Sequence, residues 1–98
     1  QYAREGFLAP IRVAAPTEAR GWRDLYDGLV ARDGGKLSKL TNSRPHMLVT
    51  ALDRMIRDAR ILDAVEDVIG GDILCWGSGF FAKKPGDGTF ISWHQDAT

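Results

Sequence analysis

The first amphipathic pattern in the chain lies between Pro16 and Gly35. Thr17 is a suitable N-cap, and the pattern stops at Asp33-Gly34-Gly35. Apolar residues follow the cap at the three- and four-residue spacing of a helix: Trp22, Leu25, Tyr26, Leu29 and Val30. We therefore expect a helix whose aromatic side chains pack in the core and do not form a platform for a ligand.

A second helical pattern begins at His46. Its apolar residues form two stripes that are out of phase with each other: Leu48, Leu52, Met55 and Ile56 in the first, and Ile61, Leu62, Val65, Val68 and Ile69 in the second. The change of phase predicts a break near Asp58, whose carboxylate can cap the second helix. Gly70-Gly71 is expected to end that helix.

The remaining segments have the composition of strands and connections. Strands are predicted over residues 6–13, 72–83 and 89–96. Pro85-Gly86-Asp87-Gly88 is a strong turn signal, so the last two strands are expected to be neighbours in one sheet. The polar residues 36–44 are expected to form a loop, in which Pro45 keeps Arg44 out of the right-handed helical region.

The last predicted strand carries the chain's most distinctive chemistry. His94 and Asp96 are two positions apart, so a strand places both side chains on one face. An imidazole nitrogen and a carboxylate oxygen at this spacing can bind one metal ion, and two His with one carboxylate form the ligand set of non-haem Fe(II) oxygenases. The alternative is a surface strand with a polar pair, because a His-x-Asp sequence also arises by chance.

The residues around this motif favour the metal site over the surface strand. In the final third they are 72–76, Ser78, Phe80-Phe81, Lys83, Pro85-Gly86 and 92–98, and earlier in the chain they are Tyr2, Gly6-Phe7, Pro10-Ile11, 44–46 and 61–67. In this order they resemble the phytanoyl-CoA dioxygenase family of Fe(II)- and 2-oxoglutarate-dependent oxygenases. The likeness extends over essentially all 98 residues and is specific in the final third.

The resemblance implies an α+β fold. Residues 1–71 would be a mainly helical N-terminal region, and residues 72–98 would be the first core strands of a double-stranded β-helix, or jelly roll, that is incomplete in this chain. In the family, the third metal ligand and the Arg that binds 2-oxoglutarate follow far downstream of His-x-Asp. We therefore expect an N-terminal part of a longer enzyme, which is inactive by itself.

The resemblance also implies roles for single residues. His94 and Asp96 would bind Fe(II), and no further catalytic residue is implied. The residues that fall where relatives line the 2-oxoglutarate pocket, or reach into it, are Phe80, Ala82 and His46; Ser78 falls nearer the substrate mouth. His46 has an alternative role as a helix-start residue bonded to the backbone. A carboxylate at position 96 indicates hydroxylation, because halogenating relatives have a small residue in its place.

Composition limits the partners. Thirteen Lys and Arg balance thirteen Asp and Glu, which argues against nucleic acid or an anionic membrane as a partner. The apolar runs are too short for a membrane span. Cys75 is the single cysteine, so no disulfide framework exists and a cytoplasmic setting is expected, with the thiol as a small apolar residue inside a strand.

The expected function is hydroxylation of a small organic substrate with Fe(II) and 2-oxoglutarate. Two other functions stay open. One is a non-catalytic small domain that self-associates through unpaired strand edges. The other is a different metal-binding enzyme of the cupin type.

Overall fold

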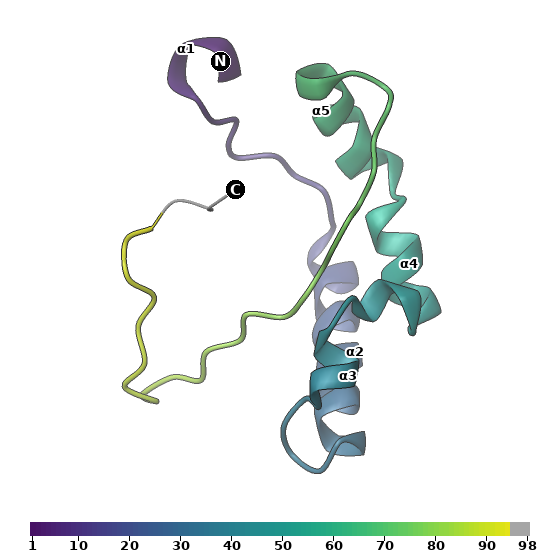
Figure 1. The fold of residues 1–98 in the computed structure, drawn as a ribbon, viewed down its shortest axis with the longest axis vertical. Coiled ribbons are helices and arrows are strands. Elements are labelled where there is room, and N and C mark those ends of the chain that lie inside the picture. Colours follow the sequence, from purple (N-terminus) through teal and green to yellow (C-terminus); the bar gives the residue numbers. More distant parts are fainter. Residues whose placement is uncertain (95–98) are drawn as a thin grey trace.

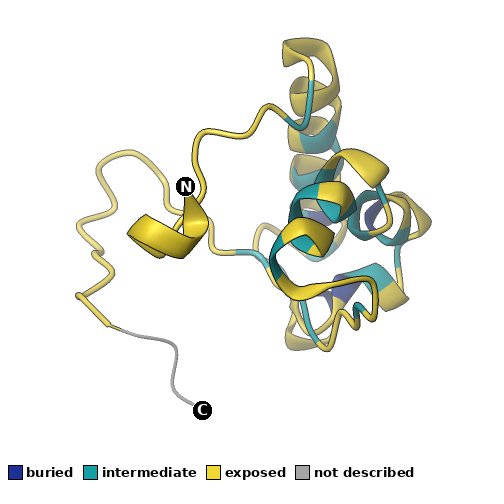
Figure 2. Ribbon diagram, turned by 90° about the horizontal axis from the view of Figure 1, so that it is seen from above, coloured by how far each residue is buried: buried dark blue, intermediate teal, exposed yellow. Residues whose placement is uncertain are grey.

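The computed structural model describes residues 1–94, and its regular elements are all helical (Figure 1). They are α1 (Tyr2–Glu5), α2 (Pro16–Arg32), α3 (Lys39–Asn42), the 3-10 turn η1 (Pro45–Met47), α4 (Thr50–Ile56) and α5 (Ala59–Ile69). After α5 the chain runs back past α4 towards α2 and α3, and then leaves the helices. The helical part contains the buried residues, whereas the N-terminal segment and the segment after α5 are mostly exposed (Figure 2).

The first predicted helix is confirmed as α2, but its start differs. Ala15 is the N-cap and Pro16 is the first helical residue. Proline suits this position because a first-turn N–H has no partner within the helix. Glu18 reaches back, and its carboxylate accepts a hydrogen bond from the Ala15 N–H at 2.8 Å. Thr17 is therefore inside the helix and is not its cap.

The predicted break at Asp58 is also confirmed. Asp58 is the N-cap of α5, and its carboxylate accepts a hydrogen bond from the Arg60 N–H at 2.9 Å. The Arg60 guanidinium also binds this carboxylate at 2.6 Å and bridges to Glu18 of α2 at 3.0 Å. The Arg60 side chain and N–H thereby lower the pKa of Asp58 to about 2. Gly70, with φ of 85°, ends α5 as expected.

The stretch between α2 and α4 is more ordered than the sequence indicates. The predicted loop over residues 36–44 contains α3, because the Ser38 hydroxyl accepts a hydrogen bond from the Thr41 N–H at 3.0 Å and so caps it. Thr41 is buried, and Arg32 donates to its hydroxyl at 3.1 Å. The helix expected from His46 onward is interrupted: η1 is a single turn, and α4 begins only at Thr50.

The predicted α+β fold with the first strands of a jelly roll is wrong. No strand is present in the part of the chain that the structure describes, and residues 6–13, 72–83 and 89–94 form neither helix nor strand. A strand exists only where a neighbouring strand accepts and donates its backbone hydrogen bonds in series. Residues 72–83 make two isolated hydrogen bonds to residues 42–44, which is too few for a ladder. Residues 95–98, with Asp96, lie outside the described residues.

The core is small. Leu29 of α2 and Leu52 of α4 are the buried apolar residues of the described chain, each with 7% of its surface exposed. Large apolar side chains stay exposed after α5, among them Trp76 and Phe81. No helix within residues 1–94 has the length and apolar character needed to cross a membrane.

The small core predicts a sharp contrast between two leucines. Leu29→Ala should reduce the free energy of unfolding by about 2–5 kcal/mol, because it opens a cavity at one of the most buried apolar side chains of residues 1–94. Leu40→Ala should change it by less than about 0.5 kcal/mol, since Leu40 is 72% exposed. Urea unfolding followed by circular dichroism at 222 nm measures both. Equal losses for the two variants would contradict this location of the core.

Candidate functional site

The segment after α5 is attached to the helices at residues 78–80. Ser78 Oγ lies 2.6 Å from Nδ1 of His46, across 32 positions of sequence. The Arg44 N–H donates to the Ser78 carbonyl at 3.2 Å, and the Phe80 N–H donates to the Asn42 side-chain oxygen at 2.8 Å. These three bonds define a clasp, which joins residues 42–46 to residues 78–80.

An aromatic contact adds to the clasp. The Phe80 ring lies against Tyr26 of α2, with centroids 5.2 Å apart and planes tilted by 55°. Such tilted pairs are favourable because the edge of one ring meets the face of the other. The clasp thus combines three hydrogen bonds with one apolar contact to the core helix.

The backbone at Arg44 creates one half of the clasp. Arg44 has φ of 52° and ψ of 53°, in the left-handed region. Pro45 follows it and disfavours the right-handed helical conformation, so the sequence correctly excluded that region but gave no sign of the left-handed one. The turn lets the Arg44 N–H face Ser78 while Pro45 begins η1.

His46 also lines a groove of about 820 Å³. Its wall combines η1, α4, α5 and the first residues after α5: Met47, Leu48, Val49, Thr50, Asp53, Ile56, Arg57, Leu62, Glu66, Gly71, Ile73, Leu74 and Cys75. Asp53 and Arg57 form an ion pair at 2.9 Å. The volume lies within the range of small-molecule sites, and the lining mixes apolar side chains with an equally large polar surface, which includes the charged Asp53, Arg57 and Glu66.

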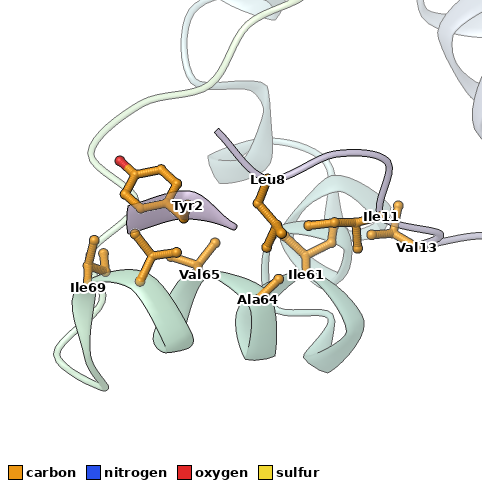
Figure 3. A pocket seen from close by; sticks show the side chains of 9 residues that line it. Tyr2, Leu8, Ile11, Val13, Ile61, Ala64, Val65 and Ile69 are labelled. Carbon is orange, nitrogen blue, oxygen red and sulfur yellow. The ribbon is translucent and has the colours of Figure 1, made fainter. Parts of the chain in front are cut away.

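A second groove, of about 320 Å³, lies between the N-terminal segment and α5 (Figure 3). Its lining is almost entirely aliphatic: Leu8, Ile11, Val13, Ile61, Ala64, Val65, Val68 and Ile69, with Tyr2 at one end. The groove contains no acid, base or nucleophile other than the Tyr2 phenol. Apart from that phenol, it contains no group suited to catalysis. We therefore regard the groove beside His46 and the clasp as the candidate site.

The predicted metal ligands are described only in part. His94 Nδ1 donates to the Ser92 carbonyl at 2.8 Å, since a carbonyl only accepts; in the neutral ring, Nε2 then carries the lone pair that a metal requires. Asp96 lies outside the described residues. Within residues 1–94, no three His, Cys, Asp or Glu side chains gather as a metal site would require. The described residues therefore do not by themselves fit an iron site.

The other predicted site residues separate into two groups. The clasp brings His46, Ser78 and Phe80 together, whereas Ala82 is exposed. His46 bonds to a side chain far away in sequence, unlike the helix-start role that was its alternative. Cys75 is exposed, and its thiol donates to the Gly77 carbonyl at 3.4 Å; the prediction of an apolar position inside a strand is wrong because no sheet covers it.

Sequence reasoning missed Asn42 and Tyr26. Asn42 ends α3 and supplies the side-chain oxygen of the clasp, and Tyr26 supplies its aromatic partner. Tyr26 was expected to pack in the core, but its contact with Phe80 after α5 was not predicted. Nothing in the pattern around Asn42 indicates a partner 38 positions later.

Comparisons of the chain with protein-family models, curated proteins and solved structures returned no match. The resemblance to the phytanoyl-CoA dioxygenase family therefore rests on the quoted residues alone.

The clasp predicts a local effect of Ser78→Ala. Loss of the bond to His46 removes about 1 kcal/mol of local stability, so the Phe80 amide should exchange about fivefold faster with solvent deuterium. Ser92→Ala is the matched control, because the bond of Ser92 within residues 1–94 uses its carbonyl, which the substitution keeps. Hydrogen exchange measured by NMR gives both rates. Unchanged exchange at Phe80 in Ser78→Ala would show that the clasp does not hold this segment.

Proposed function

We propose that this chain is the N-terminal part of an Fe(II)- and 2-oxoglutarate-dependent dioxygenase that hydroxylates a small organic substrate. The observation that supports this best is the 2.6 Å hydrogen bond between His46 and Ser78. The resemblance assigns one of these residues to the cosubstrate pocket and the other to the substrate mouth. A contact across 32 positions is what a shared pocket requires, and local sequence alone would not produce it.

The groove beside His46 supports a small organic molecule as the substrate. Its apolar side chains suit a hydrocarbon body, and the His46 imidazole and the Thr50 hydroxyl can orient a carbonyl or hydroxyl. The charged Asp53, Arg57 and Glu66 in the same lining favour a substrate that also carries polar groups.

Within this proposal the residues of the clasp bind and orient. Ser78 and His46 are hydrogen-bonded to each other. Whichever of the two accepts in this bond can direct its own O–H or N–H towards a carboxylate of the cosubstrate without a large rearrangement. Phe80 packs on Tyr26 and so holds the residues beside Ser78 against α2. These roles need no movement of the helices.

The metal supplies the oxidation. Bound Fe(II) and 2-oxoglutarate would supply the oxidation of a substrate C–H to C–OH by dioxygen, with succinate and carbon dioxide as the products of 2-oxoglutarate. The His94 imidazole is a suitable ligand for such an ion, and Asp96 would supply the carboxylate. This part of the proposal rests on the resemblance.

A cytoplasmic location belongs to the same proposal, since an exposed free thiol such as Cys75 persists in a reducing compartment.

The proposal predicts the properties of the encoded enzyme. The coding sequence after Thr98 should contain a His and, soon after it, an Arg; the protein with that extension should form succinate from 2-oxoglutarate in the presence of Fe(II). His94→Ala and Asp96→Gly should each lower succinate formation at least about a hundredfold, because each removes a metal ligand.

Lys36→Ala is the control, since Lys36 is exposed and lies outside the site. Iron content is measured alongside succinate for all variants. Full succinate formation by His94→Ala with iron still bound would refute the ligand assignment. A coding sequence that ends at Thr98 would favour the non-catalytic domain.

A further inference from the structure

The segment 72–84 exposes most of its large apolar side chains. Trp76 is 80% exposed, Leu74 85% and Phe81 93%. Isolated exposed apolar residues are ordinary, but several along one extended stretch indicate a surface that binds another molecule. The clasp attaches the middle of this stretch to the helical part at Ser78 and Phe80. The helical part therefore holds the stretch in one position.

One backbone edge of the segment is already used, and the other is open. The Ser78 carbonyl and the Phe80 N–H face residues 42–44. In an extended chain, the backbone groups of consecutive residues point to opposite edges. The groups of Cys75, Gly79 and Phe81 therefore point away from residues 42–44, and within residues 1–94 they make no hydrogen bond. The Gly77 carbonyl on this edge accepts only from the Cys75 thiol.

The sequence of the segment is complementary to itself when two copies run antiparallel around Ser78. Asp72 then lies opposite Lys84, and Trp76 lies opposite Phe80, on each side of the centre. In this register the backbone hydrogen bonds come from the odd-numbered residues, which are those of the open edge. The even-numbered residues form the pairs whose side chains approach most closely. Opposite charges and paired aromatic rings are the favourable cross-strand combinations.

We propose that residues 72–84 bind the same residues of a second copy of this chain, antiparallel, with Ser78 at the two-fold axis. The arrangement is isologous, so it closes as a dimer and does not propagate into a filament. The equal numbers of basic and acidic residues mean that no net charge opposes the approach of two copies. The clasp occupies the other edge, so the partner does not compete with it. The proposal is independent of iron and 2-oxoglutarate.

Charge exchange tests the register. In sedimentation equilibrium of the whole chain over a concentration series, Lys84→Glu should raise the dimer dissociation constant about tenfold, because it places two carboxylates opposite each other at both ends. Asp72→Lys should do the same with two ammonium groups. An equimolar mixture of the two variants should dimerise as well as the unchanged chain, since each end then pairs Lys with an acid. A monomer at every concentration, or a mixture no tighter than its parts, would overturn the proposal.

Disulfide trapping tests the axis without relying on charge. In a Cys75→Ser background, Ser78→Cys should oxidise to a covalent dimer within minutes, because opposed Cα atoms about 4.5 Å apart at the centre suit a disulfide. Ala82→Cys is the control: in this register its two copies lie about 27 Å apart, at about 3.4 Å per residue. Non-reducing electrophoresis separates the products. Faster crosslinking at position 82 than at position 78 would refute the two-fold axis at Ser78.

Discussion

The extended segment after α5 depends on the short hydrogen bond between Ser78 Oγ and His46 Nδ1. Each of the clasp's hydrogen bonds contributes about 1 kcal/mol, and the Tyr26–Phe80 ring pair contributes about as much again. These contacts are individually weak, but together they select one position for a segment that has no sheet to join. The positions of Ser78 and Phe80 beside His46 and Asn42 follow from this selection.

The helical part provides a support for the clasp despite its small core. Leu29 of α2 and Leu52 of α4 are buried, while capping groups stabilise the starts of α2, α3 and α5. Arg60 is an example, because its guanidinium binds both Asp58, the cap of α5, and Glu18 at the start of α2. Ionised Asp58 belongs to the same network, which is why its pKa is low. Contacts at the helix ends, and not a large apolar interior, therefore hold the helical part together.

Local signals predicted the helices well and the rest poorly. The end of α2, both limits of α5 and the break at Asp58 follow from capping residues and from the phase of the apolar stripes, which are properties of neighbouring residues. The start of α2 was misplaced, because Ala15 and not Thr17 is its N-cap. The strands failed because a β-favouring composition needs a partner strand, and residues 72–94 find none among the described residues. An alternating sequence without a partner stays extended and exposed.

The candidate site was accessible from sequence only through resemblance. His46, Ser78 and Phe80 were named as neighbours of one pocket, but nothing in their own spacing indicates that they meet. Asn42 was missed because its role depends on the left-handed turn at Arg44. The turn is set by the requirements of Pro45 and by the approach of Ser78, which is a contact between distant parts of the chain.

The most direct test of the clasp is the distance between the rings of Tyr26 and Phe80 in solution. Their centroids are 5.2 Å apart, so a carbon-edited NOESY spectrum should show cross-peaks between the two sets of ring protons. Phe81, which is 93% exposed, should show none to Tyr26. Cross-peaks from Phe80 alone would agree with the clasp. Their absence, or cross-peaks from Phe81 in place of Phe80, would contradict it.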